Sequence, residues 1–299
     1  MTGEDGTGDA DGDRPRRGPA ANAELALLLE VAGTPKPGNV DRRRDLANLR
    51  FEQFLAGAVG ARPGLERAAA GDPVGEAFET AVAGMSEQSG GNTQFGCLLL
   101  LVPLVRAAAA GDLTAEGVRE VCAATTVDDA AGFYRAFEHV DVAVADPPEG
   151  LDALDVRRGA DAVPALRERG ATLLDVLSAS AAPVDESGTP RDANAHEWVA
   201  GFPRTFRAAE AIRDDEGPVT DRAARAFLDL LAETEDTLVR TRHGAEVARE
   251  VRDRAAEVAS LDEAEEWADD LVGRGINPGT TADLTAAALF VALERGVTV

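Results

Sequence analysis

Apolar residues recur along the chain at the spacing of an α-helix. Between residues 51 and 59 they stand at positions i, i+3, i+4, i+7 and i+8, and the same spacing returns over 224–231 and 284–291. The alternation typical of a strand occurs only in VDVAVAD at 140–146, which is too short and isolated to anchor a sheet. The pattern therefore predicts an all-α protein. Alanine-rich segments predict further helices over 23–32, 76–87, 94–111, 114–124, 128–139, 160–180, 195–214, 245–259 and 261–273.

The first 22 residues differ in composition from the rest of the chain. Residues 1–22 consist largely of Gly, Asp, Pro and Arg with almost nothing to bury, which predicts a disordered acidic tail. Residues 23–299 contain no repeat period and no linker, and the Gly and Pro breaks between helical segments read as ordinary connections. We therefore expect one compact all-α domain with functional loops at helix N-termini.

The charge balance excludes some classes of partner. The net charge is −24, from 54 acidic and 30 basic residues, which argues against nucleic-acid and anionic-membrane binding.

Cys97 and Cys122 lack metal-ligand spacing and are expected to be reduced thiols. The start of the chain has no apolar signal segment, and the one long apolar run breaks at Pro103 and Arg106. We expect a soluble, cytoplasmic protein.

Lysine occurs once, at Lys36, in the segment TPKPGNVDRRRD at 34–45, while every other basic residue is arginine. Two prolines and a glycine end the preceding helix, so the segment is a loop. A compact ammonium on a stiff loop suits a polyphosphate, and the neighbouring aspartates suit Mg²⁺ bound to that polyphosphate. The alternative is a solvated loop whose arginines pair with the protein's own carboxylates.

Two more loops precede apolar helices. SGGNTQFG at 89–96 and INPGTTADL at 276–284 combine glycine with a helix start, where backbone N–H groups and the helix dipole favour anions. Ordinary capping by Thr93 or Thr280 explains each motif on its own. Asp129 opens another predicted helix, as either a cap or a metal ligand.

Four segments, TPKPGNVDR, GGNTQFG, EDTLVRTRHG and RGINPGTTADL, occur in this order. The set resembles the triphosphoribosyl-dephospho-CoA synthase family, over about residues 25 to 295. The resemblance implies an all-α transferase that moves the 5-triphosphoribosyl group of ATP to a ribose hydroxyl of dephospho-CoA and releases adenine. It also implies a site for Mg²⁺ and the triphosphate.

The matching motifs suggest roles for individual residues. Asp41 and Asp236 would stabilise oxocarbenium character at the ATP ribose C1′ or accept the proton of the attacking hydroxyl. Expected ligands of Mg²⁺ are Asp45, Asp129 and Asp283. Residues expected to bind ATP are Lys36, Arg42, Asn92, Thr93, Arg242, Gly279 and Thr280.

The chain departs from the family pattern at three points. Where the best-known members read NTHKG, this chain reads NTQFG at 92–96, so a His-Lys pair is missing. Arg43 and Arg44 replace an Asn-rich continuation after VDR, and His243 replaces a glycine. Two alternatives therefore stay open, namely a transferase of the same fold with another acceptor, and a non-catalytic nucleotide-binding helical protein.

The acidic excess with a single lysine is also typical of a surface adapted to high salt, where screening makes many carboxylates tolerable. We predict that the protein loses helix at low salt, because unscreened repulsion destabilises the compact state. Far-UV circular dichroism over a salt series measures this loss. Full helicity without added salt would contradict the prediction.

Overall fold

The computed structural model describes residues 17–147, 150–184 and 188–299. These ranges contain fifteen α-helices, two 3₁₀ helices and no strand, which confirms the prediction of an all-α protein. The α-helices are α1 (Pro19–Ala32), α2 (Phe51–Ala70), α3 (Val74–Met85), α4 (Phe95–Ala109), α5 (Ala115–Ala123), α6 (Val127–Ala136), α7 (Val163–Arg169), α8 (Leu173–Ala181), α9 (Ala193–Ala200), α10 (Pro203–Asp214), α11 (Val219–Glu233), α12 (Thr237–His243), α13 (Ala245–Glu257), α14 (Leu261–Gly273) and α15 (Gly279–Glu294). The 3₁₀ helices are η1 (Asp152–Leu154) and η2 (Val156–Ala162).

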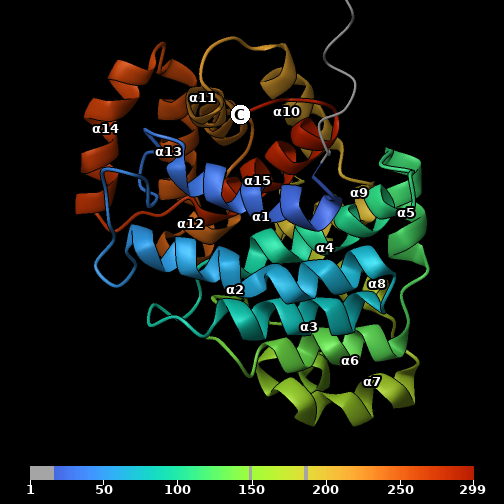
Figure 1. Cartoon of the computed structure of the whole chain (residues 1–299). Helices are drawn as coiled ribbons and strands as arrows, with labels where there is room; N and C mark the ends of the chain where they lie inside the picture. The colour runs from blue at the N-terminus through green and yellow to red at the C-terminus, as the bar shows by residue number, and fades with distance from the viewer. Residues whose placement is uncertain (1–16, 148–149, 185–187) are drawn as a thin grey trace, which may run out of the picture.

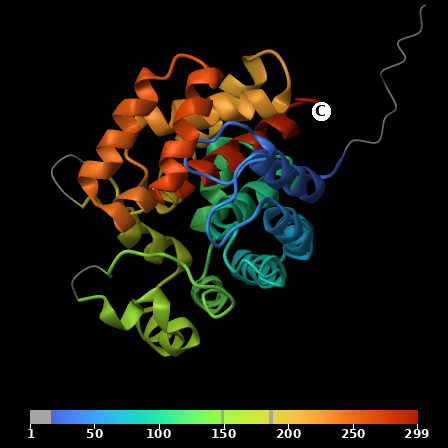
Figure 2. The same ribbon diagram turned by 90° about the vertical axis from the view of Figure 1, so that its left-hand side faces the viewer.

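The helices pack around a buried centre formed by α4 and α15 (Figure 1). Helices α1, α2, α3 and α6 follow one another in rows, and α15 packs against α1, α4 and α10. Figure 2 shows the orange helices of the C-terminal half gathered on one side and α2 and α3 on the other. Nearly every residue of α15 is buried, as expected for a helix that is apolar on all sides.

Small residues let some of these helices approach closely. A Cβ atom on Gly60 of α2 would lie 2.2 Å from the carbonyl oxygen of Gly84 of α3, and one on Gly84 would lie 2.0 Å from the oxygen of Gly60. Alanine occupies many other buried positions, beside large buried side chains such as Trp198 and Phe227. The small residues Gly60 and Gly84 therefore allow the short distance between α2 and α3.

The structure corrects two of the predicted helix boundaries. The segment 160–180 is broken by Gly170, which has φ of 62°, and 195–214 is broken by Gly201 and Phe202, both with positive φ. Because apolar spacing continues across both breaks, periodicity alone merged separate helices. Helix α1 begins at Pro19, inside the predicted tail, and residues 1–16 lie outside the described residues.

The structure also shows what becomes of the alternating segment and of the two cysteines. The alternating segment 140–146 forms no strand and instead lines a cavity described below. Cys97 and Cys122 are both free and buried. Within the described ranges, no helix combines the length and apolar character needed to cross a membrane.

Candidate functional site

A cavity of about 800 Å³ lies where four helices begin, and it is called the central cavity here. Its wall includes Phe95 at the start of α4, Asn194 in α9, Thr237 at the start of α12 and Gly279 at the start of α15. The hydroxyl groups of Thr237 and Thr280 lie 3.1 Å apart and join the starts of α12 and α15. The fold thus directs several positive helix ends at one space.

Side-chain oxygens accept backbone N–H groups at all four helix starts, and carboxylates do so at three of them. Asp192 accepts hydrogen bonds from the first N–H groups of α9, and Asp236 accepts them from those of α12, at distances of 2.8 to 3.2 Å. The residues before α4 and α15 are Gln94 and Pro278, and neither side chain caps its helix. Instead, the Phe95 N–H of α4 donates to Asn92 Oδ1, and the Thr281 N–H of α15 donates to Asp236 Oδ2. The N–H groups of Gly96, Cys97 and Thr280 donate to no described residue and remain available to a ligand in the cavity.

Aromatic rings form another part of the cavity wall. The Phe95 and Phe137 ring centroids lie 4.8 Å apart in an edge-to-face arrangement, and those of Phe133 and Phe137 lie 5.2 Å apart. The Tyr134 hydroxyl donates to the carbonyl oxygen of Leu154 at 2.5 Å, which fixes this wall to η1. The central cavity therefore joins a polar end, lined by helix starts, to a flat apolar surface, which suits a ligand with a polar and an aromatic part.

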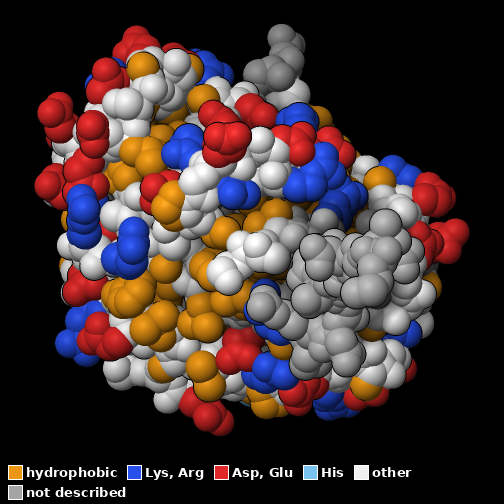
Figure 3. Space-filling model, turned by 45° about the horizontal axis from the view of Figure 1, so that its top comes forward, with side chains coloured by type: hydrophobic (Ala, Val, Ile, Leu, Met, Phe, Trp, Pro, Cys, Tyr) orange, Lys and Arg blue, Asp and Glu red, His pale blue; other side chains and the backbone are white. Residues whose placement is uncertain are grey.

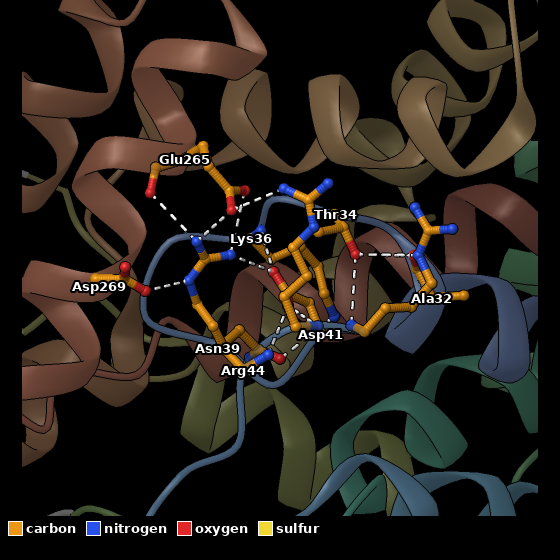
Figure 4. Close-up of polar contacts among 10 residues, drawn as sticks. Ala32, Thr34, Lys36, Asn39, Asp41, Arg44, Glu265 and Asp269 are labelled. Carbon is orange, nitrogen blue, oxygen red and sulfur yellow. Dashed lines mark hydrogen bonds and ion pairs between the residues drawn. The ribbon is translucent and has the colours of Figure 1, made fainter.

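The lone lysine is buried, and it lies close to Asn39 and Asp41 in the loop after α1 (Figure 4). The Lys36 ammonium is fully enclosed, forms an ion pair with Glu30 of α1 and donates to Asn39 Oδ1 at 3.3 Å. Glu30 and Asn39 line the central cavity, whereas Lys36 lies behind them. Burial raises the pKa of the Glu30 carboxyl, and the charge of Lys36 opposes that rise.

Asp41 organises the loop that carries Lys36. Its carboxylate accepts the backbone N–H groups of Lys36, Arg43 and Arg44 at 2.8 to 3.1 Å, and the Arg44 guanidinium at 3.2 Å. Arg44 also forms ion pairs with Glu265 and Asp269 of α14 (Figure 4). Asp41 does not line the central cavity, so the structure gives it a role in holding the loop.

Asp283 is the carboxylate with the most distinctive surroundings in the cavity. Its Oδ2 accepts from Asn194 Nδ2 at 2.8 Å, and its Oδ1 accepts from Cys97 Sγ at 3.2 Å. Burial raises the pKa of Asp283 from 3.8 to about 7, and the charges of Asp236 and Glu30 add to that rise. A Cβ atom on Gly96 would lie 2.0 Å from Asp283 Oδ2, so only glycine fits at position 96.

The structure brings together half of the residues that the sequence singled out. Arg242 stands exposed at the wall, where it makes no ion pair with any described residue. The candidate residues that line the central cavity are Asn92, Thr93, Arg242, Gly279, Thr280 and Asp283.

The other candidates are engaged elsewhere. Besides capping α12, Asp236 accepts the N–H and the hydroxyl of Thr281, both at 2.8 Å. Arg42 is exposed and donates from Nε to Thr34 Oγ1 at 3.3 Å. Lys36, Arg42, Asp41 and Asp236 are therefore not on the cavity wall.

The three expected metal ligands do not form one site. Asp45 accepts the Phe51 N–H at 2.9 Å in front of α2, and Asp129 caps α6 and accepts the Gly75 N–H at 2.8 Å. Only Asp283 lines the central cavity. In the part of the chain that the structure describes, no three His, Cys, Asp or Glu side chains are grouped as metal ligands.

Glu30 and Asn194 are among the wall residues that sequence reasoning missed. Glu30 stands inside the apolar run AELALLLEVA, and an acid directly after three leucines on a buried helix is a signal that could have marked it. Asn194 follows the cap Asp192 in DANAHEW and offers no comparable signal, because its position depends on how α9 packs beside α15.

Comparisons with known proteins show the family of this chain. A family model described as CitG, ATP:dephospho-CoA triphosphoribosyl transferase, matches residues 16–298. A crystal structure from Archaeoglobus fulgidus, provisionally described as a triphosphoribosyl-dephospho-CoA synthase, superposes with a TM-score of 0.66 at 26% identity. That alignment covers 81% of this chain and 99% of the other. No curated protein was found to match the chain.

The buried Lys36–Glu30 pair leads to a first mutational prediction. Replacement of Lys36 with methionine leaves the Glu30 carboxylate buried without its partner, which should lower the free energy of unfolding by about 3–5 kcal/mol. Denaturant unfolding followed by circular dichroism measures the change. The double variant Glu30→Leu with Lys36→Met should recover most of the loss. Equal stability of the single variant and the wild type would show that the pair is not enclosed.

The raised pKa of Asp283 predicts a pH dependence of stability. Because the folded state holds this proton more tightly than the unfolded state, Asp283 stabilises the fold below about pH 4 and loses that contribution as the pH rises through about 7. The change is at most about 1.4 kcal/mol for each pH unit.

The measurement is the difference in free energy of unfolding between the wild type and Asp283→Asn. This difference isolates Asp283 from the many other carboxylates, and it should fall between about pH 4 and 7 and level off above that range. A difference that does not change with pH would place the pKa of Asp283 at its ordinary value.

Proposed function

Because this chain belongs to the ATP:dephospho-CoA triphosphoribosyl transferase family, we propose that its central cavity is the site of the family's reaction. That reaction transfers the 5-triphosphoribosyl group of ATP to dephospho-CoA and releases adenine. The site must therefore anchor a triphosphate, hold a flat base that departs, and bring a hydroxyl to C1′ of the ATP ribose.

The observation that carries this proposal is a set of free backbone N–H groups at two helix starts on the cavity wall. Gly96 and Cys97 of α4 and Thr280 of α15 line the cavity and donate no backbone hydrogen bond to any described residue, so their N–H groups can hold phosphate oxygens. Asn92, Thr93, Gly279 and Thr280 stand at or before these two starts and line the cavity, which supports the proposal that they bind ATP. Arg242 adds a positive charge at the wall.

The lone lysine supports the site indirectly in this proposal. Lys36 fixes Glu30 and Asn39, which face the ligand, and does not itself reach the cavity. Arg42 would reach a phosphate only from outside the cavity wall. We therefore assign the direct contacts with the triphosphate to the two helix starts.

The carboxylates on the wall can perform the chemistry of the transfer. The hydroxyl oxygen of dephospho-CoA bonds to C1′ while the bond from C1′ to adenine breaks and its electron pair leaves with adenine. Glu30 is placed to stabilise the positive charge that develops at C1′, and Asp283 to take the hydroxyl proton, while adenine gains a proton as it leaves. Asp41 and Asp236 are less suited, because backbone donors occupy their oxygens.

We propose that Mg²⁺ enters as part of the substrate, bound to the triphosphate of ATP. The carboxylates expected to bind it lie apart, so no step is assigned to a metal site built from protein residues alone. A cytoplasmic location and adaptation to high salt are further proposals, supported by the net charge of −24 and by the many acidic side chains on the face shown in Figure 3.

One observation favours a second candidate, a transferase that uses another acceptor. Phe95 stands where better-known members carry a lysine, so the wall beside the helix start is apolar where theirs is charged. A change of this kind could alter which acceptor the cavity takes, while the triphosphate site stays the same.

Chromatography of reaction mixtures tests the proposal. The protein is incubated with ATP and Mg²⁺ at high salt, with and without dephospho-CoA, and free adenine is measured. We expect adenine only when dephospho-CoA is present. Adenine that forms with other hydroxyl compounds alone would favour the second candidate, and a failure to release adenine from bound ATP would contradict both.

Two matched Asp→Asn substitutions test whether Asp283 takes part in the reaction. Asp283→Asn removes the proton acceptor and should lower kcat by about 100-fold or more. Asp128→Asn makes the same change at an exposed position outside the central cavity and should leave kcat within a factor of about two. A similar kcat for Asp283→Asn and the wild type would remove Asp283 from the reaction.

A further inference from the structure

The two polar atoms of the Asn194 side chain differ in their hydrogen bonding. It is 7% exposed and lies on the wall of the central cavity, where its Nδ2 donates to Asp283 Oδ2 at 2.8 Å. Its Oδ1 is buried and accepts no hydrogen bond from any described residue. An unpaired buried acceptor costs free energy, and such groups in native proteins usually have a partner or a function.

The chemistry of the amide limits which groups can be the hydrogen-bond partner of Oδ1. Because Nδ2 faces the Asp283 carboxylate, Oδ1 is the free end, and an amide oxygen can only accept a hydrogen bond. The missing partner is therefore a donor. ATP and dephospho-CoA bring hydroxyl donors on their riboses, and one ribose hydroxyl must approach a proton acceptor for the transfer to occur.

We propose that Asn194 is a positioning residue that accepts a hydrogen bond from a substrate ribose hydroxyl and holds that hydroxyl beside Asp283. The inference rests on the proposed function of the cavity and adds a recognition contact to it. One side chain then performs two tasks, since Nδ2 fixes the carboxylate and Oδ1 fixes the group that meets it.

The surroundings of Asn194 are rigid enough for this role. Its backbone N–H donates to the Asp192 cap at 2.8 Å, which places it in the first turn of α9. Across the contact, Asp283 is held in turn by Cys97 at 3.2 Å, and the absence of a side chain at Gly96 leaves room for both groups. The pair therefore has a fixed geometry before any substrate binds.

Ligand analogues that lack one hydroxyl test the contact. Isothermal titration calorimetry gives the Kd of the wild type and of Asn194→Ala for ATP, 2′-deoxy-ATP and 3′-deoxy-ATP, and for dephospho-CoA and its 2′- and 3′-deoxy analogues. In the wild type we expect one deoxy analogue to bind about fivefold more weakly than its parent, the effect of one hydrogen bond. In Asn194→Ala this ratio should fall to about one, and the substrate that shows the change identifies the hydroxyl.

The ratio separates recognition from a structural role. A variant that only loosens the cavity weakens parent and analogue equally, so the ratio is unchanged. Asn48→Ala, at an exposed position on the same wall, serves as the control and should keep the wild-type ratio. If Asn194→Ala does not fold, the near-isosteric Asn194→Leu takes its place.

The outcomes distinguish this inference from the proposed function. If the wild type releases adenine but the ratios are the same in wild type and variant for every analogue, Asn194 does not recognise a hydroxyl and the inference alone is wrong. If the wild type binds neither ATP nor dephospho-CoA, the inference and the proposed function are both wrong.

Discussion

The buried ion pair between Lys36 and Glu30 is the interaction on which the site depends. An ammonium and a carboxylate removed from water stay charged only when they remain together, so the pair fastens the loop after α1 to the helix that precedes it. Two cavity groups, the Glu30 carboxylate and the Asn39 amide, owe their positions to this contact. Asp41, in the same loop, forms an ion pair with Arg44, and Arg44 forms another with Glu265 of α14. The loop therefore connects α1 to α14.

In a strongly acidic chain, backbone N–H groups and helix dipoles can offer an anion donors without adding a mobile cation to the surface. At the starts of α4 and α15, the N–H groups of Gly96, Cys97 and Thr280 line the central cavity and donate to no described residue. Carboxylates neutralise the neighbouring starts of α9 and α12 and fix their directions. Because the backbone groups lie at a cavity wall, salt screens them less than it screens exposed lysines, which fits a chain with a net charge of −24.

The sequence predicts the helices well and the site in part. Apolar spacing identified the elements, but it could not find the breaks at Gly170 and Gly201, because these depend on backbone conformation. The motifs at 89–96 and 276–284 do meet at the cavity. A local pattern cannot distinguish a capping carboxylate from a reacting one. Asp236, whose catalytic role the family motif suggests, caps helix starts and does not line the cavity. Asn194 gained its position from packing between distant segments, which no short motif records.

Phe95 joins the start of α4 to an aromatic cluster. Its ring lies 5.1 Å from that of Phe78 and 4.8 Å from that of Phe137. A lysine at this position would have to place its stem among these rings, and it would bring a cation to the cavity wall. In this chain the backbone of α4 begins at the same residue and lines the same cavity. A ligand at this point of the wall would therefore meet backbone N–H groups beside an apolar ring, and an anion held there would depend on those N–H groups and not on a side chain at position 95.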